Sequence, residues 1–136
     1  MKKYFFVLPL LAMAWSVWYL LRPNYKFTKY QLSDCSENFT LVEYFAYFKR
    51  GFVIVAGDYN TQEIPTSNCI TLPEMNGISP YYEFIATCED KHIVINFRRY
   101  ISNQTYNSSK IFIKKVDGEQ YQNMRDHGVG TLIKLF

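Results

Sequence analysis

Three cysteines and two histidines are the residues of this chain best suited to chemistry: Cys35, Cys69, Cys88, His92 and His127. A thiolate can act as a nucleophile or bind a metal, and histidine is the most frequent general base. Neither type occurs at the short spacings of a zinc site, such as C-x-x-C or H-x-x-x-H. The sequence therefore predicts no metal site and no cofactor.

The cysteines are expected to pair if the chain reaches an oxidising compartment. Cys88 ends a strand-like run, and Cys69 begins the short apolar run Cys-Ile-Thr-Leu, which is suited to lie beside it. The pattern favours a Cys69–Cys88 disulfide, which closes a loop of about 20 residues and contributes on the order of 3 kcal/mol. Cys35 then stays unpaired, for a bridge within a homodimer or to a partner. Three reduced, buried cysteines are the alternative if the domain faces the cytoplasm.

The histidines lack an evident catalytic partner. His92 is expected on the wetter face of its strand as a surface residue. His127 follows Asp126 directly, and adjacent side chains point apart, so this carboxylate is poorly placed to orient the ring. We therefore predict that the chain is not an enzyme. A small envelope enzyme that uses Cys35 or His127 is the alternative.

An uncharged apolar segment, residues 4–21, precedes the rest of the chain. A helix of about 18 residues at ~1.5 Å per residue spans roughly 27 Å, close to the thickness of the hydrocarbon core of a bilayer. Trp15, Trp18 and Tyr19 would lie near one membrane interface, where amphipathic rings are enriched. Residues 1–21 are thus predicted to form a transmembrane signal anchor. Cleavage after Ala14, the alternative, would leave a free terminus rich in exposed aromatic side chains.

The short basic tail before this segment, Lys2 and Lys3, is typical of a secretory start. It predicts a single-pass protein of the bacterial inner membrane with its C-terminal domain in the periplasm. Residues 22–36 are expected to be a juxtamembrane connector, and residues 37–136 an extracytoplasmic domain.

Composition limits the partners of the exported part. Of the 15 Lys and Arg residues two precede the apolar segment, which leaves 13 basic against 12 acidic side chains. A net charge of about +1 without basic runs excludes a nucleic-acid-binding surface. The many Tyr and Phe residues are typical of a small β domain with a thin core.

The pattern of residues 37–136 predicts a mostly β fold. Runs at 41–48 and 52–56 flank a glycine turn and indicate a hairpin, although 37–48 also fits a helix. A second hairpin is predicted from 82–88 and 92–100, where Ile93, Ile95 and Phe97 alternate with a largely wet face. Residues 110–116 and 131–136 are further strands, and 119–126 form a short helix. We expect a small antiparallel sheet or meander, or an α+β fold with one short helix, behind the transmembrane helix.

These features predict a membrane-anchored envelope protein whose periplasmic domain binds another envelope or incoming protein. An inhibitor or immunity protein against a toxin or hydrolase fits, as does an accessory subunit of an envelope complex. A lipocalin-like ligand-binding domain is a further alternative.

Overall fold

A computed structural model describes residues 7–33, 35–46, 49–73, 82–98 and 105–135 of the chain. These residues form two helices and nine strands. Their bounds are α1 (Val7–Leu21), β1 (Asn24–Gln31), β2 (Asn38–Ala46), β3 (Lys49–Ala56), β4 (Cys69–Thr71), β5 (Tyr82–Glu89), β6 (His92–Phe97), β7 (Thr105–Asn107), β8 (Ile111–Lys115), α2 (Gly118–Asp126) and β9 (Thr131–Leu135).

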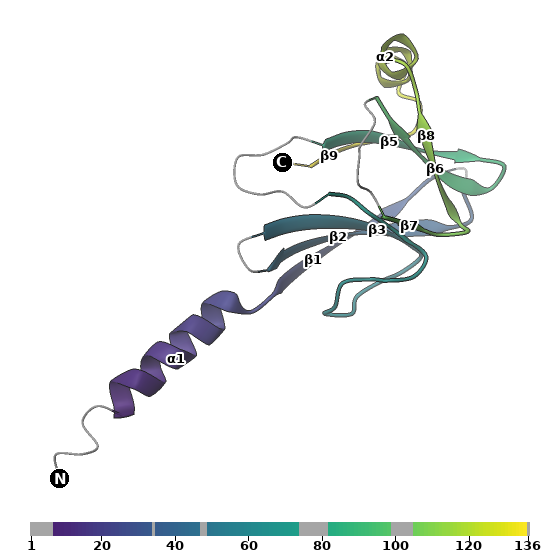
Figure 1. The fold of residues 1–136 in the computed structure, drawn as a ribbon. Helices are drawn as coiled ribbons and strands as arrows, with labels where there is room; N and C mark the ends of the chain where they lie inside the picture. Colours follow the sequence, from purple (N-terminus) through teal and green to yellow (C-terminus); the bar gives the residue numbers. More distant parts are fainter. Residues whose placement is uncertain (1–6, 34, 47–48, 74–81, 99–104, 136) are drawn as a thin grey trace.

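The strands form two sheets that lie face to face, with α1 extending away from one end and α2 lying against one side (Figure 1). Sheet A has the order β1-β2-β3-β4-β7 and is antiparallel throughout. Sheet B has the order β8-β6-β5-β9, in which β6 and β8 run parallel. The architecture is therefore a two-layer sandwich of one antiparallel and one mixed sheet.

The main core lies between the sheets. Sheet A contributes apolar side chains such as Phe39, Phe52 and Ile54, and sheet B contributes Phe84 and Ile95, all at most 1% exposed. Because successive side chains of a strand point to opposite faces, these residues recur at every second position. The inner faces of both sheets are in this way turned towards each other.

Local signals in the sequence explain the hairpins and the helix. The link between β5 and β6 is two residues long, Asp90 and Lys91, both with positive φ, as a tight hairpin turn requires. Asp117 caps α2, since its carboxylate accepts a 2.7 Å hydrogen bond from the Gln120 N–H. Gly128, at φ 64°, ends the helix in the left-handed conformation that favours glycine.

The predicted mostly β fold is confirmed, together with both hairpins and the short helix near residues 119–126. The single antiparallel sheet or meander is wrong, because the strands divide between two sheets and one pair is parallel. The helical alternative for residues 37–48 is also wrong, because β2 pairs with neighbours on both sides. Residues 22–36, predicted as a connector, contain β1, which pairs with β2 along its whole length.

The apolar helix α1 covers 15 residues, and none of its side chains is buried. Across the part of the chain that the structure describes, no helix combines the length and apolar character needed to cross a membrane. The predicted transmembrane helix over residues 4–21 is therefore not supported, and residues 4–6 of that segment lie outside the described residues.

Candidate functional site

The cysteines are arranged differently from the prediction. Cys35 and Cys88 form a disulfide with their Cα atoms 5.5 Å apart, and Cys69 is buried with a free thiol. The bond joins the β1–β2 connection of sheet A to the C-terminal end of β5 in sheet B. The predicted disulfide is confirmed as a feature, whereas the predicted Cys69–Cys88 pairing is wrong.

The direction of the Cys69 side chain explains this error. On β4, Ile70 points into the inter-sheet core, so Cys69 points to the outer face of sheet A and packs with Val42 and Val53. Cys88 packs against the inter-sheet core, on the other side of sheet A. The Cys69 thiol instead donates to the Pro65 carbonyl at 3.5 Å, and burial raises its pKa. A bond from Cys69 to Cys88 would have to pass through the sheet.

The chemistry expected of Cys35 is lost with its thiol. Its side chain is 6% exposed and bonded to Cys88, so it offers neither a thiolate nor an intermolecular bridge in this state. The predictions of an unpaired Cys35 and of a homodimer joined through it are corrected accordingly.

The two histidines lie on different elements and contact different residues. His92 is exposed on β6, as predicted, and its ring meets the edge of Phe112 at a centroid distance of 5.2 Å. His127 is exposed at the C-cap of α2, with Nδ1 2.9 Å from the Asn123 carbonyl oxygen. The neighbouring Asp126 carboxylate accepts from Gln122 at 2.7 Å. Among the described residues, no three His, Cys, Asp or Glu side chains are grouped to hold a metal ion.

The membrane-anchor residues predicted from the sequence lie on α1. Trp15, Trp18 and Tyr19 are 59–75% exposed, and the Arg22 guanidinium lies over the Trp18 ring, 5.9 Å from its centroid. Only Arg22 and Pro23 separate α1 from β1. An exposed apolar helix is thus joined almost directly to the edge of the sandwich.

The outer face of sheet A is covered by aromatic side chains and by the β3–β4 connection. Tyr25 and Phe27 stack at 6.4 Å on β1, and Phe27 meets Tyr59 of the connection at 6.2 Å. The Thr40 hydroxyl donates to the Gly57 carbonyl at 2.8 Å and accepts from the Tyr59 N–H at 3.2 Å. These contacts hold the connection over β2.

Asp58 fixes the same connection through charge. Its Oδ1 atom accepts a hydrogen bond from Asn38 at 2.7 Å and lies 2.6 Å from Lys29 Nζ. The hydrogen bond from Lys29 holds the pKa of this carboxyl below its usual value. Residues of this connection, Asp58 and Tyr59 among them, line a shallow hollow of about 370 Å³.

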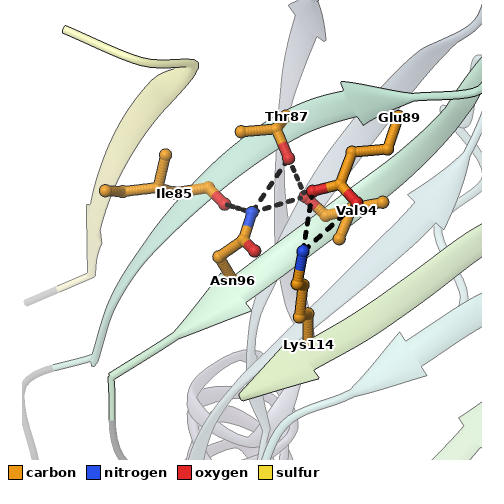
Figure 2. A network of polar contacts seen from close by, with 6 residues as sticks. All are labelled: Ile85, Thr87, Glu89, Val94, Asn96 and Lys114. Carbon is orange, nitrogen blue, oxygen red and sulfur yellow. Dashed lines mark hydrogen bonds and ion pairs between the residues drawn. The ribbon is translucent and has the colours of Figure 1, made fainter. Parts of the chain in front are cut away.

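The outer face of sheet B carries a buried polar network (Figure 2). Asn96 is fully buried, and its Nδ2 group donates to the Ile85 carbonyl at 3.1 Å and to the Thr87 hydroxyl at 2.9 Å. Its Oδ1 atom has no hydrogen-bond partner among the described residues. Beside it, Lys114 forms a surface ion pair with Glu89 at 3.3 Å. The face containing Asn96 was predicted to be largely wet, and this part of the prediction is wrong.

The helix α2 covers part of the outer face of sheet B, around Ile85. Tyr121 is 2% exposed and packs with Ile85 and Val116. Arg125 of the same helix lies 3.8 Å from Glu83 on β5. The sequence predicted this helix without predicting the face that it covers.

The free edge of β1 is a further feature that the sequence did not indicate. Among the described strands, only β2 pairs with β1, so the opposite edge of this eight-residue strand has no neighbour there. Unpaired N–H and C=O groups at such an edge can accept another strand.

Comparisons with protein-family models, with curated proteins and with solved structures each find no significant match.

Proposed function

We propose that this chain is a membrane-anchored envelope protein whose β-sandwich binds another protein. In this proposal the apolar segment at residues 4–21 holds the sandwich at the bacterial inner membrane, with the domain in the periplasm. The partner is an envelope protein or an incoming protein. The chain acts either as an inhibitor or immunity protein against a toxin or hydrolase, or as an accessory subunit of an envelope complex.

The observation that carries the proposal is the exposure of α1. An isolated helix whose apolar side chains all face outwards is unfavourable in water, because contiguous exposed apolar surface marks a membrane or protein contact. The two-residue link to β1 then keeps the sandwich within reach of whatever surface covers the helix.

The disulfide supports the assignment of compartment. Bonds such as Cys35–Cys88 form and persist in the periplasm and outside the cell, and are rare in the cytosol. A periplasmic domain with a stable two-layer core is suited to act by contact with a partner.

The membrane part of the proposal is tested on the full chain, expressed in a bacterium and extracted with alkaline carbonate. The unaltered chain is expected in the membrane fraction, and Leu11→Arg in the soluble fraction, because a charge in an inserted apolar segment costs roughly 3 kcal/mol. Gln122→Arg, on the exposed face of α2, is the matched control and should stay with the membrane. Soluble recovery of the unaltered chain would overturn the anchor.

The partner part is tested by chemical crosslinking of the same cells. The full chain is expected to yield one discrete heteromeric adduct, and Leu11→Arg to lose it, since the partner meets the domain at the membrane. If the unaltered chain gave no adduct while it remained in the membrane, binding of another protein would be ruled out under these conditions.

A further inference from the structure

The edge strand β1 differs from the other edges of the sandwich in length. It pairs with β2 over eight consecutive residues, from Asn24 to Gln31, without a gap in register. The other edge strands, β7, β8 and β9, have three, five and five residues. A long and regular edge is the preferred site for the addition of an extended segment from another protein.

The lysines of β1 protect this edge incompletely. A lysine beside an edge normally hinders the approach of another strand. Lys29 pairs with Asp58, however, which is held over the outer face of β2 by Asn38. The Lys29 side chain is therefore drawn across the sheet and away from the edge, and Lys26 is the exposed lysine that remains there.

Symmetry argues against a second copy of this chain as the occupant. In a parallel pair of strands, a residue whose backbone N–H and C=O groups point towards the partner strand lies beside a residue whose groups point away from it. Two copies of the same strand can therefore pair in parallel only with a register shift of an odd number of residues. A two-fold axis along the strands would require a shift of zero, so two β1 strands related by two-fold symmetry can pair only in the antiparallel sense. The two α1 helices would then leave from opposite ends, which conflicts with attachment to one membrane surface.

Charge indicates the chemistry of the occupant. Residues 22–33 contain Arg22, Lys26 and Lys29 and no acidic residue, although the domain as a whole is nearly neutral. The charge of Lys29 is compensated by Asp58, whereas Arg22 precedes β1 and Lys26 lies in its first half. Glu43 lies opposite Lys26 in the register, but its carboxylate pairs with Arg50. An acidic segment would complement these two charges while its backbone pairs with the strand.

We propose that the free edge of β1 binds an extended, acidic segment of another protein, which adds to sheet A as a sixth strand. This inference rests on the proposed function, because it assigns the surface that the partner uses. Main-chain hydrogen bonds supply the affinity, and Arg22 and Lys26 select against basic segments.

The experiment places a photoreactive phenylalanine analogue at Lys26 in the full, membrane-attached chain, with Lys134 on the edge strand β9 as the matched control position. Irradiation is expected to join position 26, and not position 134, to a different protein. Lys26→Glu, tested with the analogue at Gln31, should reduce the adduct at least tenfold, whereas Lys134→Glu should leave it unchanged. In the isolated adduct, alternate β1 amides should exchange hydrogen at least tenfold more slowly than in the free chain.

The outcomes separate the two proposals. An adduct at position 134 alone would overturn the β1 edge and leave the proposed function standing. An adduct between two copies of this chain at position 26 would overturn the acidic partner. No adduct at either position, together with none by chemical crosslinking, would overturn both.

Discussion

The two outer faces of the sandwich are covered by different means. On sheet A, side chains of the sheet itself and the β3–β4 connection exclude water, with Tyr25, Phe27 and Tyr59 in contact. On sheet B, the separate helix α2 lies over Ile85, and the fully buried amide of Asn96 completes the layer. Sheet A is thus covered by its own side chains and by the loop between two of its strands, whereas sheet B is covered in part by a helix that must dock onto it.

This difference predicts how each face responds to damage. A helix that docks through few buried side chains can undock while the sheet beneath it stays paired, since local opening involves the region with the fewest buried contacts. The cover of sheet A is continuous with the strands and should open only with the sheet. The following substitutions test this contrast, from the largest expected effect to the smallest.

Tyr121→Ala should detach α2, because Tyr121 is the buried anchor of that helix. Loss of a large buried aromatic side chain costs about 3 kcal/mol of unfolding free energy. Denaturant unfolding gives the cost, and hydrogen exchange should show lost protection in α2 with little change in β2 and β3. Tyr121→Phe, which keeps the ring, is the control. Equal loss of protection in both sheets would break the contrast.

Gly51→Ala should strain sheet A directly. Gly51 lies opposite Tyr44 across β2 and β3, and an added Cβ would meet the Tyr44 ring at well under contact distance. Overpacking of this kind costs about 2 kcal/mol. In a Tyr44→Ala background the same substitution should cost much less, and a double-mutant cycle by chemical denaturation measures this coupling. A cost independent of Tyr44 would contradict the proposed contact.

Asn96→Ala should weaken sheet B by about 1 to 2 kcal/mol, because the Thr87 hydroxyl and the Ile85 carbonyl lose a buried donor. Thermal unfolding measures the loss. In a Thr87→Val background, the cost should fall, since one of the two groups that would be left unsatisfied is then absent. An unchanged cost would show that the amide acts independently of Thr87.

Asp58→Asn should have the smallest effect: a slight loss of stability at neutral pH and a weaker dependence of stability on pH. Lys29 lowers the pKa of Asp58 in the folded chain, so its contribution is present above the unfolded pKa and is lost as the pH falls through the folded pKa. Unfolding midpoints measured between neutral and acidic pH should therefore fall less steeply for the variant. Asp90→Asn, at the exposed β5–β6 turn, is the control and should keep the steeper profile.

The sequence predicted those strands in which apolar residues occupy every second position. Ile93, Ile95 and Phe97 recur at every second position, and β6 lies where this period indicates. In β1, by contrast, Tyr25 and Phe27 lie on the outer face, but the next aromatic residue, Tyr30, lies on the inner face, so the strand period is interrupted after one repeat. The strands β4 and β7 have three residues each, too few to show any period.

The candidate sites were harder to predict because they depend on which faces of the sheets pack against other elements. The alternation in β6 placed Asn96 correctly on the face opposite Ile93 and Ile95, but its burial and its hydrogen bonds depend on the pairing of β6 with β5. The cysteine pairing needed the side-chain direction at Cys69, which depends on the register of β4 against β3. Neither arrangement is encoded in a local pattern.

The outward direction of Cys69 also bears on how the chain acquires its disulfide. Until β4 pairs with β3, all three thiols can reach one another, and two of the three pairings are incorrect. Once sheet A is formed, it separates Cys69 from Cys88, and the Pro65 segment shields the remaining thiol. We therefore expect thiol–disulfide exchange to favour the Cys35–Cys88 bond, because the folded sheet is compatible with that isomer. In this account, the formation of sheet A determines which pair of cysteines remains joined.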